Sequence, residues 1–205
     1  MAFNPTIGLG STPNDGQGAG LRTNMGKLIE NDNYLKAQVD AFANSTPGVV
    51  SNGSITQLTP LDARFFNNVE SVGAIKITLP QSYTSTRITL FISIFDRESS
   101  ESVELIISGY NYLANSEWLF TTVQVLASLA DRNYPVRFGH DGSKCCIYIG
   151  ELNSSWNPTV VVTKGIFSFN SNSSDKWLTG WNISLETNSF QNVTQIKTNN
   201  LIVAQ

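Results

Sequence analysis

Three tryptophans stand in polar surroundings, and their side chains are the ones in this sequence best suited to hold a ligand. Trp156 lies in the polar stretch 153–158, and Trp177 and Trp181 follow in a second polar stretch. An indole offers a flat apolar face for stacking on a sugar ring and an N–H for a hydrogen bond. The alternative is that these rings cap the ends of a hydrophobic core. The predicted glycan or receptor contacts are Trp156, Asn157, Trp177 and Trp181.

Catalytic groups are harder to assemble. Any Ser-His-Asp or Cys-His arrangement must use His140, the single histidine of the chain. Asp141 is its neighbour in sequence, so the two side chains do not naturally face each other, and no Gly-x-Ser-x-Gly motif is present. Glycoside hydrolysis needs two carboxyl groups at a defined separation, and no spacing singles out a pair. We therefore predict no catalytic residue and no enzymatic activity, with glycan cleavage kept as a minor alternative.

The two cysteines, Cys145 and Cys146, are adjacent. Neighbours on a strand point to opposite faces, and a disulfide between them is strained. We predict one buried and one half-exposed thiol, both reduced. Two cysteines with one distant histidine do not make a zinc site, and the chain has no phosphate loop, HExxH or EF-hand pattern. No metal and no cofactor are predicted.

Composition limits the partners. Only 14% of residues are charged, the net charge is −3, and Asn, Ser and Thr supply 62 of 205 residues. No basic cluster is dense enough to neutralise a run of phosphates, so nucleic-acid binding is not expected. No run of 18 apolar residues predicts a membrane span, and the first 18 residues do not resemble a secretory signal. We expect the protein to fold in a cytosol, with a polar uncharged surface.

Residues 21–43 carry apolar side chains whose spacing alternates between four and three throughout if Asp32 is included. This spacing is the heptad pattern of a helix that pairs with other helices along a narrow seam. The alternative is an ordinary amphipathic helix packed on its own domain, but such a helix normally has a wider apolar stripe. The predicted oligomerisation residues, called the seam below, are Leu21, Met25, Leu28, Asp32, Leu35, Val39 and Phe42.

From residue 47 onward, short period-2 segments rich in β-branched and aromatic residues follow one another between turn signals. This pattern predicts a mainly β fold, an antiparallel β-sandwich of jelly-roll-like type. The predicted domains are 1–46, with a glycine-rich extended segment (1–20) before the helix, and 47–205, the β-sandwich head. The predicted strands are 49–58, 74–79, 87–95, 102–110, 118–127, 135–138, 144–150, 159–169, 181–186 and 193–203.

Two stretches resemble bacteriophage tail and fibre proteins. The first runs from Ile7 to Gly16 and on through Gly20-Leu21-Arg22 to Ile29-Glu30-Asn31-Asp32-Asn33. It is similar to a phage structural motif in which a Pro-Asn-Asp-Gly loop precedes a short helix. In that family this segment lies at the start of a virion module or near a fibre joint.

The second stretch runs from Asp131 to Gly150 and continues through Trp156 to Trp181. It resembles a β domain that recurs near the C-termini of phage tail fibres, and the likeness covers most of 60–190. The resemblance implies a virion location after assembly in the host cytoplasm, a homotrimer, and a head that touches a host-surface glycan or protein.

The sequence thus predicts a non-enzymatic, tail-fibre-like virion protein. Residues 1–20 are expected to dock on other virion proteins, 21–43 to form the trimer, and the head to bind a receptor. The alternative is a purely architectural adaptor in the neck, tail or head fibre.

Overall fold

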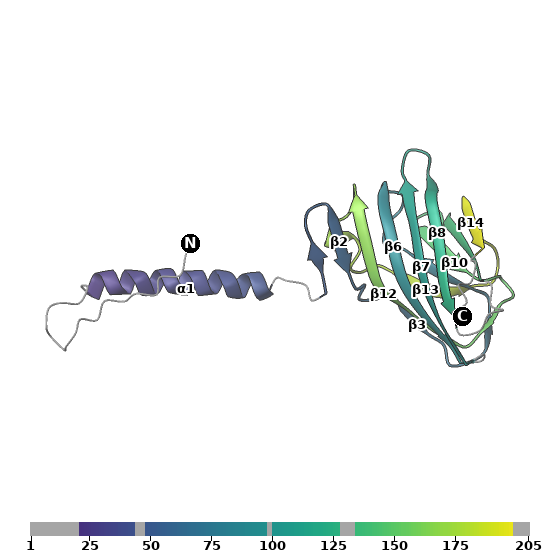
Figure 1. Cartoon of the computed structure of the whole chain (residues 1–205), viewed down its shortest axis with the longest axis horizontal. Coiled ribbons are helices and arrows are strands. Elements are labelled where there is room, and N and C mark those ends of the chain that lie inside the picture. The colour runs from purple at the N-terminus through teal and green to yellow at the C-terminus, as the bar shows by residue number, and fades with distance from the viewer. Residues whose placement is uncertain (1–20, 44–47, 98–99, 128–133, 199–205) are drawn as a thin grey trace. The chain divides into compact units, whose positions relative to one another are not determined.

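The computed structural model describes residues 21–43, 48–97, 100–127 and 134–198. The chain divides into two units, Met1–Pro47 and Gly48–Gln205, and each is described by itself. The fold is mainly β with one long helix, as the sequence predicted (Figure 1).

Helix α1 spans Leu21–Ala43, with the predicted bounds. It has no proline, but it contains Gly26, and neither an acidic residue in its first turn nor a basic residue in its last turn stabilises the helix dipole. A helix of this length without such support is only marginally stable in water by itself. Its stability must therefore come from packing.

The larger sheet of the second unit is antiparallel and has the order β1-β2-β12-β6-β7-β8, with β3 also paired to β12. Strands β6, β7 and β8 form a meander of long, consecutive strands (Figure 1). The bounds are β1 Val50–Ser51, β2 Ile55–Leu58, β3 Arg64–Phe66, β6 Thr86–Asp96, β7 Glu101–Tyr112, β8 Glu117–Ala127 and β12 Pro158–Phe169.

The smaller sheet has five antiparallel strands in the order β13-β5-β10-β9-β14, and β4 and β11 form a separate pair. A short 3-10 helix, Ser174–Lys176, precedes β13. The bounds are β4 Ser71–Val72, β5 Ala74–Thr78, β9 Pro135–His140, β10 Cys145–Ile149, β11 Ser155–Trp156, β13 Asn182–Glu186 and β14 Gln195–Thr198.

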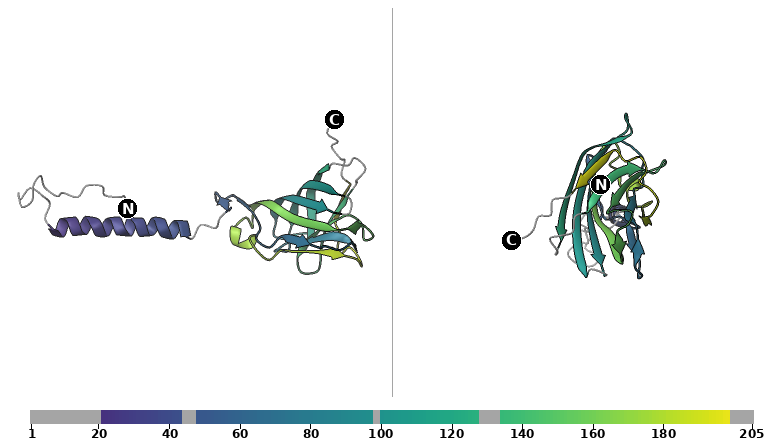
Figure 2. Two further views of the ribbon diagram at one scale, coloured as in Figure 1. Left: turned by 90° about the horizontal axis from the view of Figure 1, so that it is seen from below. Right: turned by 90° about the vertical axis from the view of Figure 1, so that its right-hand side faces the viewer.

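The two sheets face each other across one hydrophobic core, and the end view shows them as two layers (Figure 2). Alternation on β6 turns Ile88, Leu90, Ile92 and Ile94 into this core. The outward side of the same strand carries Phe95, which is 47% exposed. The large sheet is therefore built as one buried face and one open face.

The outer face of the smaller sheet is covered instead. Tyr148 and Cys146 point outward from β10, and Phe190 and Val193, in the segment between β13 and β14, pack over them. Phe190 meets the Tyr148 ring edge-on, with 5.3 Å between ring centroids. This second small cluster leaves the larger sheet as the one with an open face.

Most predicted strands are confirmed to within a few residues, but the strand predicted at 49–58 is a hairpin of two short strands, β1 and β2. Three further short strands, β3, β4 and β11, were not predicted. These have two or three residues each, too few for alternation to be recognised. The prediction of a strand from 193 to 203 was too long at its start, and its end lies beyond the described residues.

Candidate functional site

The tryptophans predicted to contact a glycan are buried, so that prediction was wrong. Trp156 is 1% exposed, its Nε1–H donates to the Gly73 carbonyl oxygen at 2.8 Å, and its ring stacks on Tyr134. The neighbouring Asn157 is half-buried, and its backbone N–H donates to Asp96 Oδ1. A ring enclosed on both faces offers no surface to a sugar.

Trp177 and Trp181 are 0% and 5% exposed and close one end of the core. The Trp177 ring stacks on Phe167 with 4.4 Å between centroids. Trp181 Nε1–H donates to the Trp177 carbonyl oxygen at 2.6 Å, and Trp177 Nε1–H donates to the Ser171 carbonyl. Capping of the core, the alternative considered from the sequence, is what these rings do.

His140 has a serine partner that sequence analysis did not identify. Ser82 Oγ lies 2.8 Å from His140 Nε2, and the ring stacks on Tyr83. The other ring nitrogen, Nδ1, accepts the backbone N–H of Gly142 at 3.0 Å. In the neutral ring the proton must therefore sit on Nε2, which donates to Ser82. This is the reverse of the proton transfer that a serine nucleophile needs.

The loop after His140 is held by Asp141. Its Oδ1 accepts the backbone N–H groups of Ser143 and Lys144, at 2.9 and 2.8 Å. Partial burial opposes the charge, but these donors keep the pKa of the Asp141 carboxyl below its ordinary value. The carboxylate thus stabilises a turn and does not orient the histidine.

Both cysteines are buried and free, which corrects the prediction of one half-exposed thiol. Cys145 points into the main core, and Cys146 lies under the cover formed by Phe190 and Val193. Burial raises the pKa of the Cys145 thiol well above its ordinary value and that of Cys146 to about 11. Neither thiol is poised for reaction at neutral pH.

Among the described residues, no three His, Cys, Asp or Glu side chains gather closely enough to hold a metal ion. Within the same ranges, no helix is long and apolar enough to span a bilayer.

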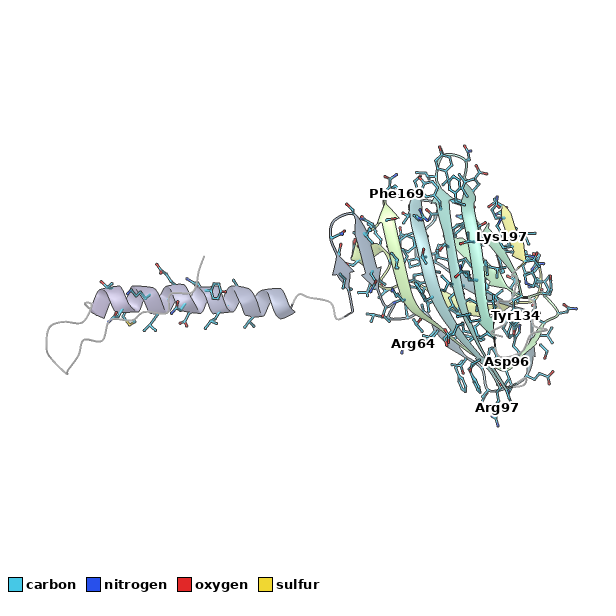
Figure 3. All side chains as sticks on the ribbon, in the orientation of Figure 1. Arg64, Asp96, Arg97, Tyr134, Phe169 and Lys197 are labelled. Atoms are coloured by element: carbon cyan, nitrogen blue, oxygen red, sulfur yellow. The ribbon has the colours of Figure 1, made fainter. Side chains whose placement is uncertain are left out.

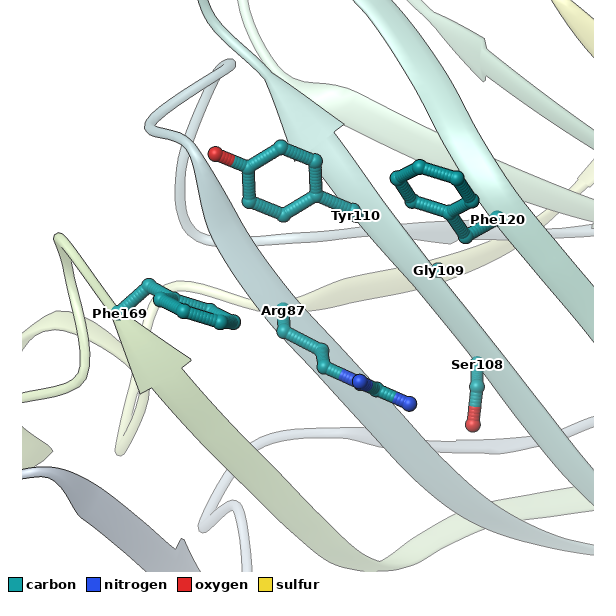
Figure 4. Close-up of a pocket in the computed structure, with 6 residues that line it drawn as sticks. All are labelled: Arg87, Ser108, Gly109, Tyr110, Phe120 and Phe169. Atoms are coloured by element: carbon teal, nitrogen blue, oxygen red, sulfur yellow. The ribbon is translucent and has the colours of Figure 1, made fainter.

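The open face of the larger sheet has a hollow of about 210 Å³ at the end where β12 terminates. Figure 3 places Phe169 at this end and Asp96 and Arg97 at the opposite one. The close-up in Figure 4 shows how the side chains lie across β12, β6, β7 and β8. We call this site the aromatic hollow; it is lined by Arg87, Ser108, Gly109, Tyr110, Phe120 and Phe169.

Phe120 reaches the aromatic hollow through a break in the strand pairing. Between β7 and β8 the register shifts, so that Phe120 and Thr121 both stand opposite Gly109. Phe120 has φ +52° and its side chain is 84% exposed. Such a β-bulge redirects a side chain, and a left-handed backbone at a residue with a bulky side chain costs about 1–3 kcal/mol.

Gly109 permits this bulge. A Cβ at this position would lie 2.9 Å from Cε3 of Trp118, whose indole is buried and donates from Nε1 to the Gly139 carbonyl oxygen at 3.1 Å. The bulge opposite Gly109 thus positions both the buried Trp118 indole and the exposed Phe120 ring.

Phe169 also departs from the alternation of its strand. Gly165 and Phe167 turn inward on β12, so the residue two further on should do the same. Phe169 instead has φ +71° and is 64% exposed. Its ring meets Tyr110 edge-on, with centroids 6.0 Å apart.

Two phenylalanines therefore reach one surface by two separate backbone distortions. Burying a phenylalanine side chain would stabilise the fold by about 1.5–3 kcal/mol. Because both rings are largely exposed, the protein lacks most of this stabilisation at both positions. Strain of this kind clusters at functional sites such as ligand clamps, where the surrounding structure maintains it.

Polar groups complete the site. Arg87 on β6 pairs with Ser168 on β12 and with Tyr110 on β7. Two residues further along β6, Thr89 Oγ1 lies 2.9 Å from Ser108 Oγ on β7. In the part of the chain that the structure describes, the Arg87 guanidinium has no hydrogen bond or ion pair with a protein group.

A second, shallower hollow adjoins the first and shares Arg87 and Phe169 with it. Its volume is about 540 Å³, and its remaining lining combines the exposed apolar side chain of Ile55 with the polar side chains of Ser54, Ser168 and Asn172. Asn172 Nδ2–H donates to the Gly53 carbonyl oxygen at 3.0 Å and joins the two sides of this hollow. We call it the polar hollow; it is lined by Gly53, Ser54, Ile55, Arg87, Ser168, Phe169 and Asn172.

The seam on α1 is open to solvent wherever its side chains are described. Met25, Leu28, Leu35 and Val39 are 50%, 43%, 51% and 64% exposed, and Asp32 is exposed as well. The side chains of Leu21 and Phe42 lie outside the described set. The least exposed stripe of the helix is polar and consists of Asn24, Lys27, Asn31 and Tyr34. This is the opposite of a helix packed by its apolar face on its own domain.

No family model matches this chain, and neither a curated protein nor a solved structure is similar enough to count as a match. The arrangement of its own residues must therefore carry the functional argument.

Sequence reasoning missed the aromatic hollow for a physical reason. Because Ile88 is predicted to face the core, alternation along the strand predicts that Arg87 faces outward. The same rule predicts that Phe169 faces inward, together with Phe167. Neither Phe120 nor Phe169 is itself a residue type that signals a left-handed backbone, because the residues that favour it are glycine and asparagine.

Proposed function

We propose that this chain is a non-enzymatic, tail-fibre-like phage virion protein that forms a homotrimer through α1 and binds a host-surface receptor through its β head. Residues 1–20 attach it to other virion proteins. The likeness of residues 7–33 and 131–181 to phage fibre proteins supports the virion location and an oligomer of three chains. The coiled-coil packing of α1 belongs to this proposal.

The observation that carries the proposal is the exposed seam. Apolar side chains in four-three spacing along a helix of 23 residues form a surface that matches copies of itself. Asp32 in the middle of this stripe is costly in the core of a single domain. At the centre of a coiled coil, a polar residue sets register and oligomer number.

The jelly-roll-like arrangement of the head remains a prediction. Two Greek keys define a jelly roll, and the meander of β6, β7 and β8 within one sheet is the feature that argues against it.

A trimer suits receptor binding because three linked heads raise the effective concentration of each site for a surface. The aromatic hollow on each head is small, and one copy alone is expected to bind weakly. Display of three copies on one stalk turns weak contacts into stable attachment.

Light scattering of the full chain tests the trimer. The expected mass is three times the 22.4 kDa of one chain. Leu28→Asp with Leu35→Asp places charges in the seam and should give a monomer. The control is Thr23→Asp with Ala37→Asp, which adds the same charges to exposed positions off the seam and should leave the mass unchanged. A monomeric wild-type chain would overturn the proposal.

A further inference from the structure

We propose that the aromatic hollow binds a single sugar ring that carries a carboxylate, such as a hexuronic or sialic acid unit of a surface glycan. The inference rests on the proposed function and deepens it, because it names the ligand chemistry and the side chains that recognise it.

The apolar side of the hollow fits the face of a sugar ring. Tyr110, Phe120 and Phe169 stand on three different strands and surround one small volume (Figure 4). At about 210 Å³, this space is below the roughly 300–1,000 Å³ of sites for drug-sized ligands. One ring fits, with its C–H face against the phenyl groups, while the open side leaves room for its links to the rest of a chain.

The polar side of the aromatic hollow favours a negatively charged ligand. Arg87 rises from the floor of the hollow between Tyr110 and Ser168, and its guanidinium has no protein partner among the described residues. A guanidinium binds a carboxylate through two parallel hydrogen bonds. The Ser108 hydroxyl, paired with Thr89, is placed to exchange hydrogen bonds with ring hydroxyls.

The polar hollow indicates the direction in which a longer glycan would extend over the surface. It shares Arg87 and Phe169 with the aromatic hollow and continues toward Ser54 and Asn172. A saccharide that starts in the aromatic hollow would pass over Phe169 and meet hydroxyl and amide groups there.

A second copy of the chain is the competing occupant of this surface. An unpaired arginine at the centre of an interface between copies would need an acid from the partner. Among the described residues that line the aromatic hollow and the polar hollow, none is acidic. Charge complementarity therefore favours an anionic ligand.

Saturation-transfer NMR on the full chain tests the inference with five probes. The acidic probes are the methyl glycosides of glucuronic acid, galacturonic acid and N-acetylneuraminic acid; the neutral ones are those of glucose and galactose. We expect transfer to at least one acidic sugar, and at least tenfold weaker binding of the neutral sugar of the same ring stereochemistry. No transfer to any acidic sugar at millimolar concentration would overturn the inference.

Variants locate the site. Arg87→Gln should remove the preference for the acid, and Phe120→Gly should abolish transfer to every probe. The control is Phe66→Ala, which removes another exposed phenyl ring on the same sheet, 69% exposed, and should change nothing. Transfer that survives Phe120→Gly would contradict the assignment.

Phe120→Gly also separates a binding role from a structural one. Glycine accepts the left-handed backbone at this position, so the variant should unfold at equal or higher urea concentration while binding is lost. A lower oligomer mass in this variant would instead assign the surface to contact between copies. The seam variant Leu28→Asp with Leu35→Asp should keep the per-head affinity, so failure of the trimer and failure of the sugar site are distinguishable.

Discussion

The helix and the head both expose apolar side chains, but they do so by opposite means. On α1 the exposed residues follow the regular spacing of an undistorted helix, whereas in the head Phe120 and Phe169 are exposed by breaks in the regular pattern. Regular exposure produces a long surface that suits an identical partner. Exposure through local distortion produces a small site whose shape suits a ligand.

The substitution with the largest expected effect unfolds the helix and leaves the head folded. Leu28→Asp with Leu35→Asp should remove most of the helical circular dichroism signal, because α1 without its partners has no capping charges to support it. The near-ultraviolet signal of the buried tryptophans should persist. Loss of both signals together would show that the two units depend on each other for folding.

High pH should weaken the head and leave the seam intact. In the folded state burial raises the pKa of Cys146 from 9.0 to about 11, so the stabilisation from its neutral thiol is complete below pH 9 and is lost as the pH rises toward 11. The loss amounts to about 2–3 kcal/mol for this one group. The helix has no cysteine.

Urea titrations of the head at pH 8, 9, 10 and 11 measure this decline. Cys146→Ala should flatten the part of the curve between pH 9 and 11, while Cys145, Tyr83 and Tyr148, whose pKa values burial also raises, contribute the remainder. An unchanged slope in the variant would contradict the burial of this thiol.

Gly109→Ala should destabilise the head by about 1–3 kcal/mol, because the new methyl group meets the buried Trp118 ring. Since the bulge that projects Phe120 depends on this contact, sugar binding should weaken at the same time. Urea unfolding and saturation transfer on the same sample measure both. A neutral effect on the unfolding midpoint would show that the bulge does not need glycine.

The matching substitution in the helix should have a smaller effect and the opposite sign. Among the described residues, no atom lies within 4 Å of the position that a Cβ on Gly26 would take, so Gly26→Ala should stabilise α1 by about 1 kcal/mol. The thermal midpoint of the helical signal should rise at fixed protein concentration. A fall would mean that a partner helix approaches the backbone closely at Gly26.

The same contrast explains what the sequence predicts. Four-three spacing and two-residue alternation are periodic, so the bounds of α1 and of most long strands follow from them. The burial of Trp156, Trp177 and Trp181 does not, because polar neighbours in the chain say little about the folded neighbours of a ring. Likewise, the cover over Cys146 comes from Phe190 and Val193, more than forty residues away.

The measurement that tests the whole account most directly compares trimer and monomer on a sugar surface. Surface plasmon resonance on immobilised polysaccharides made of the three acidic sugars would record the wild-type chain and the Leu28→Asp, Leu35→Asp variant side by side. We predict that the wild type holds the surface about 10²–10⁴-fold more tightly, although both have the same affinity for a single sugar in solution. Equal attachment of trimer and monomer would contradict a fibre that works by joining three weak sites.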